Sequence, residues 1–369
     1  MKINRSSKLY FKKWLTQQKK NQIKIILAEY SKIVNYFITT YRDQVPGLLK
    51  KELLLAKHTQ LCIINTSTWL TARMVKNAFT EGYGMLQSYK SNLKNDKSHS
   101  LPKHTGKKAH LSCTTNTQSE DTHTVEFDFN LILGSIGNKF KISIPLKKHK
   151  QFNRWNSVGK RSSTVVLTDS YIQFSFEINV PKKKTVGSKL GIDIGLNKLL
   201  VTNVGEIYGE KLRSLIDKLR RKRQKSKAYY RCLEEIKEYI NKCCKDFYDE
   251  HKDLYLIVVE ALKKVKYKMK LKRRLSRNMR RVIHNWNYAY VLERLQRLSE
   301  ENRVSFRSVN PRYTSVQCSS CNYIDKKNRQ SQERFYCQSC GYSDNADINA
   351  SKNILSRFLT GTYGFCFQT

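Results

Sequence analysis

The sequence predicts a multidomain α/β protein, in which a helical unit and an antiparallel β unit precede a mixed α/β domain that carries a metal site. Three observations support this class. Apolar residues recur at helical spacing over the first ~95 positions and alternate with a period of two over residues 110–180. After residue 188, short apolar runs separate charged helical stretches, and two Cys-x-x-Cys pairs follow. A chain of 369 residues is long enough for two or three such domains.

The helical unit begins with residues 18–42, where apolar side chains at i, i+3, i+4 and i+7 oppose a lysine-rich face. A short helix is expected over residues 48–58. Thr66-Ser67 is the expected N-cap of a third helix, which reaches about residue 92. Residues 91–110 are polar, basic and interrupted by Pro and Gly, so they predict a loop or linker.

The β unit is predicted from four runs, of which 170–180 has the clearest pattern. Its residues Ile172, Phe174, Phe176 and Ile178 alternate with polar residues, so one face of this strand should be buried. The other predicted strands are 123–133, 139–146 and 163–169. The lysines that follow, in residues 181–184, are expected to form a hinge.

The mixed domain begins with the short apolar strand 189–195. The remaining predicted elements are a hairpin partner and third strand (199–204 and 206–209), a charged helical stretch (209–250), a buried strand (253–260), a helix around 286–298, and a strand at 304–309.

The charge points to a polyanionic partner. Lys and Arg number 70 and Asp and Glu 30, which gives a formal net charge of +40. The chain shows no run of the ~18 apolar residues that a spanning helix needs, and its N-terminus lacks the apolar core of a signal peptide. Nucleic acid is therefore favoured over a membrane, and the expected location is the cytoplasm (prokaryotic cytosol or nucleoid).

Four cysteines have the spacing of a structural zinc site. Cys318-x2-Cys321 and Cys337-x2-Cys340 are separated by fifteen residues, and two such pairs place four thiolates at the corners of a tetrahedron. Free thiols are the alternative. A catalytic zinc is disfavoured, because four thiolates leave no position open for water.

Three carboxylates form the candidate catalytic set. Asp193 and Glu260 each end an apolar strand, and Asp347 lies where the first-turn amides of a helix favour an anion. Taken singly, each is explained as a strand end or a helix cap. If the first strand of the domain lies parallel beside the fourth, however, both strand-end carboxylates emerge at one edge, and a helix across that edge adds Asp347. Such a set suits two Mg²⁺ ions, or Mn²⁺, which can hydrolyse a phosphodiester.

Three segments carry a family resemblance. GIDIGLNKLLV (191–201), LYLIVVEAL (254–262), and RYTSVQCSSC with CQSCGYSDNADINASKNI (312–354) resemble the TnpB family of transposon-encoded RNA-guided nucleases, which are related to compact type V CRISPR effectors. The resemblance implies an RNase H-like RuvC nuclease domain with an inserted zinc ribbon, and assigns catalysis to Asp193, Glu260 and Asp347. Asp344 is the rival third carboxylate. Asn322 departs from the family, which usually has Gly after the second cysteine.

The resemblance also implies a domain order. A β-rich wedge barrel would comprise residues 1–12 and 98–185, and a helical recognition lobe residues 13–97. The RuvC-like domain would comprise 186–313 and 343–369, and the zinc ribbon 314–342. The implied function is RNA-guided DNA endonuclease, with guide RNA and target double-stranded DNA as partners, two catalytic Mg²⁺ and one structural Zn²⁺. Both a monomer and a homodimer are compatible with the sequence.

A basic run adjoins Glu260. It holds eleven Lys or Arg in nineteen residues and predicts a nucleic-acid channel, although a solvated charge run is the usual explanation of such a tract. Residues 220–227 and 182–184 would extend the channel. The basic residues of the run are Lys263, Lys264, Lys266, Lys268, Lys270, Lys272, Arg273, Arg274, Arg277, Arg280 and Arg281.

Three other functions remain open on the sequence alone. A compact type V CRISPR effector would differ mainly in genomic context. A protein-only DNA nuclease would use the same carboxylates but would leave nearly 190 preceding residues without a role. A nuclease-inactive, zinc-ribbon DNA-binding repressor is disfavoured by the intact set of carboxylates.

Overall fold

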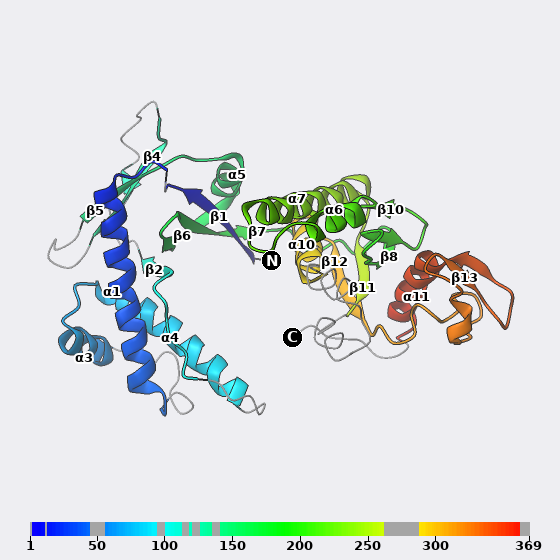
Figure 1. The fold of residues 1–369 in the computed structure, drawn as a ribbon, viewed down its shortest axis with the longest axis horizontal. Coiled ribbons are helices and arrows are strands. Elements are labelled where there is room, and N and C mark those ends of the chain that lie inside the picture. Colours follow the sequence, from blue (N-terminus) through cyan, green and yellow to red (C-terminus); the bar gives the residue numbers. More distant parts are fainter. Residues whose placement is uncertain are drawn as a thin grey trace. The chain divides into compact units, whose positions relative to one another are not determined.

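The computed structural model describes residues 2–11, 13–44, 56–93, 100–112, 118–119, 126–134, 141–261 and 288–361 (Figure 1). The chain divides into two compact units, one of residues 2–179 and one of residues 180–369, to which Met1 is assigned. The division falls directly before the lysine-rich residues 181–184. Within the described residues, no helix is both long and apolar enough to span a bilayer.

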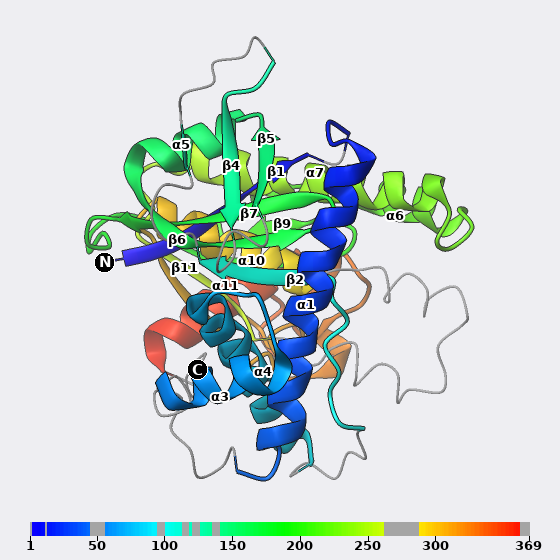
Figure 2. The same ribbon diagram turned by 90° about the vertical axis from the view of Figure 1, so that its left-hand side faces the viewer.

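The longest helix of residues 2–179 packs through one apolar stripe. α1 (Gln17–Tyr41) buries the predicted i, i+3, i+4 residues and is capped by Thr16, whose hydroxyl accepts from the backbone N of Lys19. It lies against α4 (Ala72–Leu93), as Figure 2 shows, and the rings of Phe37 and Phe79 are 4.9 Å apart between centroids. The amphipathic helix predicted over residues 18–42 is therefore confirmed.

The predicted N-cap at Thr66-Ser67 is wrong. Thr66 is the last residue of α3 (Ala56–Thr66), and its hydroxyl donates to the carbonyl of Cys62. The hydroxyl of Thr71 caps α4 instead, by accepting from the backbone N of Met74. Several Ser and Thr residues in this segment could each cap a helix, and packing selects between them. Most of the short helix predicted over 48–58 lies outside the described residues.

The strands of residues 2–179 form two antiparallel sheets. The first has the order β1-β7-β6-β2, and in β7 the four predicted apolar residues are buried. The strands of this sheet are β1 (Lys2–Tyr10), β7 (Tyr171–Asn179), β6 (Gly159–Thr168) and β2 (Lys108–Ser112). The second sheet contains β3 (Gln118–Ser119), β4 (Phe129–Gly134) and β5 (Lys141–Leu146). Helix α5 (Lys150–Val158), which follows β5, was not predicted from the sequence.

The unit of residues 180–369 is built on a mixed five-stranded sheet with the order β10-β9-β8-β11-β12. β8 pairs parallel with β11 and antiparallel with β9, and β11 pairs parallel with β12. The parallel pairing of the first and fourth strands, which was the condition for bringing the two strand-end carboxylates to one edge, is thus present. The strands are β8 (Lys189–Asp193), β9 (Leu200–Thr202), β10 (Ile207–Tyr208), β11 (Leu256–Glu260) and β12 (Ser305–Val309).

Helices cover both faces of this sheet. On one face, α6 (Leu212–Arg220), α7 (Lys227–Glu250) and α10 (Tyr288–Glu301) bury the larger apolar core, which includes Ile192 and Ile257. On the other face, Leu256 and Val258 pack against Ile354 of α11 (Ala346–Thr360). The domain therefore has three layers, and α11 alone among the described helices joins the second apolar cluster.

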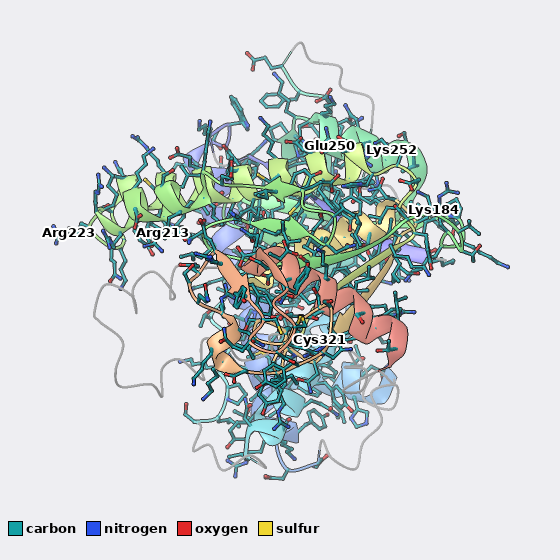
Figure 3. The ribbon with its side chains drawn as sticks, turned by 90° about the vertical axis from the view of Figure 1, so that its right-hand side faces the viewer. Lys184, Arg213, Arg223, Glu250, Lys252 and Cys321 are labelled. Carbon is teal, nitrogen blue, oxygen red and sulfur yellow. The ribbon has the colours of Figure 1, made fainter. Side chains whose placement is uncertain are left out.

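Several hydrogen bonds attach the start of this unit, among them one from the backbone N of Lys184 to the carbonyl of Arg303 (2.8 Å). The ammonium of Lys184 donates to the backbone carbonyls of Lys252 (2.5 Å) and Leu254 (3.2 Å), next to the beginning of β11 (Figure 3). Figure 3 also shows Arg223 at the far end of the hairpin formed by α6 and α7. In this hairpin the single charged helical stretch predicted for 209–250 is divided by a short basic turn.

Candidate functional site

Asp193 and Glu260 end neighbouring parallel strands. Ile192 of β8 pairs with Val259 of β11, and each carboxylate is the next residue along its strand. Because side chains alternate between the faces of a sheet, the burial of Ile192 and Val259 under α6, α7 and α10 places both carboxylates on the opposite face. That is the face covered by α11.

Gly191 allows α11 to approach this face closely. A Cβ atom at Gly191 would lie 2.3 Å from the backbone oxygen of Ser351 and 2.8 Å from the Cβ of Leu355, so only a residue without a side chain fits there. Ser351 lies one turn after Asp347, and its hydroxyl donates to the Asp347 carbonyl (2.7 Å). The close approach therefore brings the first turn of α11, with Asp347, to the edge where β8 ends.

The charges of Glu260 and Asp347 act on the buried carboxyl group of Asp193. Burial, followed by the charges of Glu260 and Asp347, raises the pKa of Asp193 to about 8. Burial also raises the pKa of Glu260, against the hydrogen bond from Thr314 and the charges of Arg357 and Arg329. The unfavourable charge that these groups share is what a bound cation would relieve.

Asp344, the rival third carboxylate, is engaged by other side chains. Asp344 lies on β14 (Ser343–Asn345), where it accepts from the Lys352 ammonium (2.8 Å) and the Tyr342 hydroxyl (2.6 Å). These bonds, against burial, hold the pKa of Asp344 below its usual range. It is Asp347, not Asp344, whose charge acts on Asp193.

Three neighbours of the carboxylates were not identified from the sequence. Arg329 donates to Oδ1 of Asp347 (3.2 Å), the hydroxyl of Thr314 donates to Oε1 of Glu260, and the hydroxyl of Tyr288 donates to the Glu260 carbonyl (2.8 Å). They lie in separate segments with no common pattern. Only Thr314 had a signal, since it lies within RYTSVQCSSC, one of the segments that carry the family resemblance.

The donor set of the carboxylates suits a hard divalent cation. Carboxylate oxygens without histidine are the ligands that Mg²⁺ and Mn²⁺ prefer. Within the described part of the chain, however, the potential ligand atoms that gather closely are those of the four cysteines, and Asp347 is paired with Arg329. Metal binding would therefore require Asp347 to exchange this ion pair for the cation.

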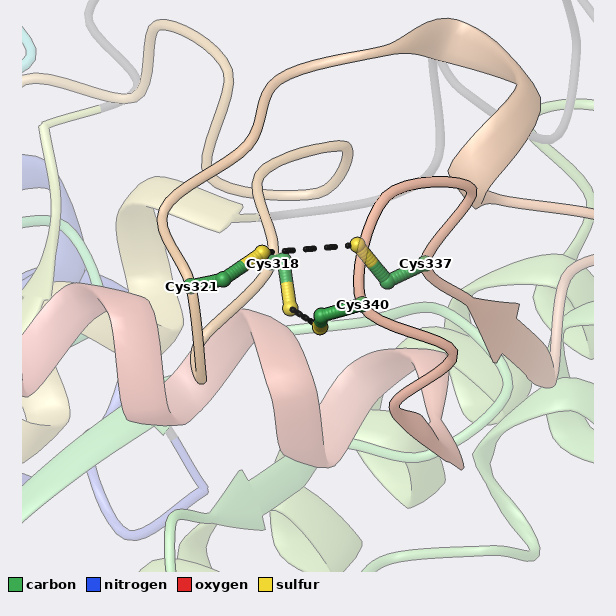
Figure 4. Close-up of side chains that lie close together, drawn as sticks. All are labelled: Cys318, Cys321, Cys337 and Cys340. Carbon is green, nitrogen blue, oxygen red and sulfur yellow. Dashed lines mark hydrogen bonds between the residues drawn. The ribbon is translucent and has the colours of Figure 1, made fainter.

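The four predicted cysteines meet at one point. The Sγ atoms of Cys318, Cys321, Cys337 and Cys340 all lie within 4.8 Å of one another, with Cys318 and Cys340 3.7 Å apart and Cys321 and Cys337 3.6 Å apart (Figure 4). A tetrahedral zinc with Zn–S bonds of about 2.3 Å requires sulfurs about 3.8 Å apart. The cluster therefore fits a structural zinc site.

The two Cys-x-x-Cys loops have the same backbone geometry. In the first, the N of Cys318 donates to the Tyr323 carbonyl and the N of Asn322 to the Cys318 carbonyl; in the second, Cys337, Gly341 and Tyr342 repeat this pattern. Asn322 has a φ of 65° and Gly341 a φ of 71°. Asn is among the few residues that tolerate this left-handed conformation, so the departure from glycine at position 322 leaves the loop intact.

A row of buried polar side chains connects the cysteine loops to the sheet. Asn349, Asn353 and Arg357 recur every four residues on one face of α11, and each is at most 3% exposed. We call these three residues the α11 polar row. Its members bind backbone groups of the segment 310–319, which runs from β12 to the first cysteine loop. The row thus holds this segment against the helix that carries Asp347.

The eleven predicted nucleic-acid-binding residues, Lys263 to Arg281, lie outside the described residues. The two basic stretches proposed to extend them are described. Arg221, Arg223 and Lys225 in the turn between α6 and α7 are exposed, as are Lys227 at the start of α7 and Lys182 at the start of the unit. These cations are available to an anionic partner.

Solved structures of CRISPR effectors share the fold of this chain at low sequence identity. One, a mini-RNA-guided endonuclease CRISPR-Cas_phi3, has a TM-score of 0.58 at 10% identity, over 96% of this chain and 92% of that chain. Another, a Cas12f1-sgRNA-target DNA complex, has a TM-score of 0.55 at 17% identity, over 92% and 83%.

The sequence comparisons support the resemblance to TnpB proteins. Residues 288–354 match the family model described as Cas12f1-like, TNB domain. A TnpB-like protein of Aquifex aeolicus is 36% identical over 23% of this chain and 30% of its own length. The putative RNA-guided DNA endonuclease InsQ of Escherichia coli is 28% identical over 50% and 52%, respectively.

A third relative is a CRISPR-associated endodeoxyribonuclease Cas12f1 of Sulfoacidibacillus thermotolerans. It is 40% identical over 20% of this chain and 18% of its own length. The chain thus spans about half or less of the length of each of these relatives.

Proposed function

We propose that this protein is an RNA-guided DNA endonuclease, which hydrolyses phosphodiester bonds of target DNA at a site formed by Asp193, Glu260 and Asp347. The observation that carries the proposal is the convergence of these carboxylates from two parallel strands and one helix on a single face of the sheet. Relatives named as RNA-guided or CRISPR-associated DNA endonucleases support the proposal that this nuclease uses a guide RNA.

The chemistry follows from the donor set. Asp193, Glu260 and Asp347 would hold two Mg²⁺ ions, which when bound activate a water and stabilise the leaving oxygen. Asp193 would lose its proton as it takes up this role, because its pKa lies near 8 without a cation. Arg329, displaced from Asp347, would then be available to neutralise a phosphate oxygen. Hydrolysis of this type is expected to leave 5′-phosphate and 3′-hydroxyl ends.

The remaining parts of the chain have proposed roles in binding. The helices α1, α3 and α4 would form a recognition lobe, and the two antiparallel sheets a wedge domain, for the guide RNA and the duplex that flanks the target. One Zn²⁺ would hold the cysteine loops as a ribbon, which the α11 polar row anchors beside the site. The formal charge of +40 suits both nucleic-acid partners.

The use of a guide RNA is tested by recovering the RNA that is bound to the protein. The gene would be expressed with its native flanking DNA, the protein purified, and the RNA that co-purifies sequenced. One discrete species with a constant part from the locus is expected, and it would identify a target for cleavage assays. Heterogeneous RNA would instead favour the protein-only nuclease. A repeat array beside the gene would favour a compact type V CRISPR effector.

The catalytic assignment has its own test. Alanine at Asp193, Glu260 or Asp347 should abolish Mg²⁺-dependent cleavage of that target while leaving its binding intact. Asp344→Ala is the matched control, because Asp344 belongs to a separate ion pair with Lys352. If Asp347→Ala cuts normally, the assignment is wrong. If the wild type binds DNA but never cuts it, the nuclease-inactive DNA-binding repressor becomes the favoured function.

A further inference from the structure

The buried hydroxyl of Thr314 contacts the proposed site directly but has no part in the function proposed above. Thr314 is 2% exposed, and it lies between β12 and the first cysteine loop. Its hydroxyl donates to Oε1 of Glu260, and its own Oγ also lies 3.1 Å from the carbonyl of Pro311. It therefore connects the segment that leads to the zinc ribbon with a carboxylate at the end of β11.

Two features make this contact more than incidental burial of a polar group. A hydroxyl carries one proton, and a carboxylate is a stronger acceptor than a peptide carbonyl, so an ionised Glu260 takes the hydrogen bond. Once Oε1 is engaged in this way, the carboxylate can no longer rotate freely, and Oε2 is the oxygen left for another ligand.

The position of Thr314 is itself fixed from α11. The side-chain amide of Asn353 donates to the Thr314 carbonyl (3.0 Å) and to the Gln317 carbonyl (2.7 Å). Arg357 donates to the carbonyls of Asn310 and Arg312, on the other side of Thr314. The helix that carries Asp347 thus holds the residue that orients Glu260, so two of the three carboxylates depend on one set of contacts.

We infer that Thr314 is a positioning residue for the metal site, which orients the Glu260 carboxylate for a divalent cation through the hydrogen bond to Oε1. The inference rests on the proposed function, because it requires Glu260 to be a ligand. Outer hydrogen-bond partners of metal ligands typically change metal affinity by about 10–100-fold when they are removed. The effect should therefore appear in cation binding itself, apart from any effect on cleavage.

The test is Mn²⁺ binding to the full-length, zinc-loaded protein without nucleic acid, followed by calorimetry or by electron paramagnetic resonance. Thr314→Val, which keeps the shape but removes the hydroxyl, should raise the dissociation constant about 10-fold or more. Thr314→Ala should do the same without adding a methyl group to the buried site. Thr314→Ser, which keeps the hydroxyl, should remain within about twofold of the wild type.

Thr202→Val is the matched control for a purely structural effect. Thr202 is also buried and also donates to a glutamate, Oε2 of Glu206 (3.3 Å), but it pairs with Ile192 and so lies on the other face of the sheet. It should lose thermal stability as Thr314→Val does, with unchanged Mn²⁺ binding.

The outcomes separate this inference from the proposed function. If Asp193→Asn weakens Mn²⁺ binding while Thr314→Val and Thr314→Ala bind as the wild type does, Thr314 is structural and the inference alone is overturned. If Thr202→Val weakens binding as much as Thr314→Val, the effect is a general loss of packing, and the inference is again overturned. If Asp193→Asn leaves Mn²⁺ binding unchanged, the metal site itself is wrong, and the inference and the proposed function both fail.

Discussion

Among the proposed site residues, Asp193 is the one whose ionised form burial and neighbouring charges disfavour most. Its carboxyl group is buried, and the charges of Glu260 and Asp347 act on it. Both effects raise its pKa, to about 8 in the metal-free protein. An unfolded aspartate titrates near 3.9. Between these two values, folding without a cation therefore requires Asp193 to take up a proton. Stabilisation of the metal-free fold falls as the pH rises through this window.

Asp193→Asn should remove this pH dependence. Without Mg²⁺, the variant should melt at a higher temperature than the wild type at pH 8, by at least about 2 °C, and the difference should shrink as the pH is lowered towards 4. Differential scanning fluorimetry across this range measures the effect. Asp249→Asn, which alters an exposed carboxylate paired with Lys252, is the control and should show no gain. A constant difference at all pH values would contradict the assigned pKa.

The proposed site depends on the packing of helix α11 against strand β8. No side chain fits between Gly191 and the backbone of Ser351, so the helix packs at a distance that only glycine permits. Its apolar side closes the sheet through Ile354, and its polar row holds segment 310–319. One helix thus brings Asp347, Thr314 and the cysteine loops to the ends of two strands.

Gly191→Ala should separate α11 from the sheet. The added Cβ would overlap a backbone oxygen that has no freedom to rotate away, so we expect a loss of about 3 kcal/mol or more of stability and loss of cleavage. Gly84→Ala, in the exposed interior of α4, meets no atom within 4 Å and should be neutral or stabilising by about 0.5–1 kcal/mol. Thermal unfolding of both variants tests the contrast; equal stability of the two would refute the close packing.

The cysteine loops lead to a separate prediction about metal content. The purified protein should contain one zinc per chain, and Cys321→Ser should lose it, together with most cleavage, because the first loop anchors to α11 through the backbone N of Ser319 and Asn349. Elemental analysis measures the zinc. Ser320→Ala, which leaves all four thiols in place, is the control. Full zinc retention in Cys321→Ser would rule out a four-thiolate site.

At the scale of the whole molecule, the dominant property is charge. An excess of 40 positive charges on 369 residues repels itself unless a polyanion neutralises it. Exposed arginines and lysines occur at the turn between α6 and α7 and near the start of the second unit. The largest basic run, residues 263–281, is a further contributor by its sequence.

Binding of nucleic acid should therefore depend steeply on salt. With six to ten phosphate contacts, affinity should fall about 10³–10⁵-fold between 50 and 200 mM salt, through release of condensed counterions. A filter-binding or fluorescence titration at several salt concentrations gives the slope. Replacing Arg221, Arg223, Lys225 and Lys227 with Gln should make the slope shallower, whereas the same change at Lys245, which is paired with Asp249, should have little effect. An affinity that does not change with salt concentration would contradict binding through phosphate contacts.

The sequence by itself determined the features that arise from local pattern. Helical periodicity predicted α1, alternation predicted the buried face of β7, and cysteine spacing predicted the four-sulfur cluster, because each pattern is encoded within a few dozen consecutive residues. The strand-end positions of Asp193 and Glu260 were equally local. The family resemblance implied a β-rich wedge that includes residues 1–12, but the residues themselves did not predict β1 as a strand, since it pairs with β7 about 170 residues away and has little alternation of its own.

Only the tertiary structure decided which residues meet at the site. The ion pair of Asp344 with Lys352, the contacts of Arg329 and Thr314, and the polar row of α11 all join segments that are separated in the chain by eight to more than fifty residues. The cap of α4 was decided in the same way, between hydroxyl residues that the sequence could not distinguish. Such choices depend on which groups packing buries together, and burial is a property of the folded chain rather than of any one segment.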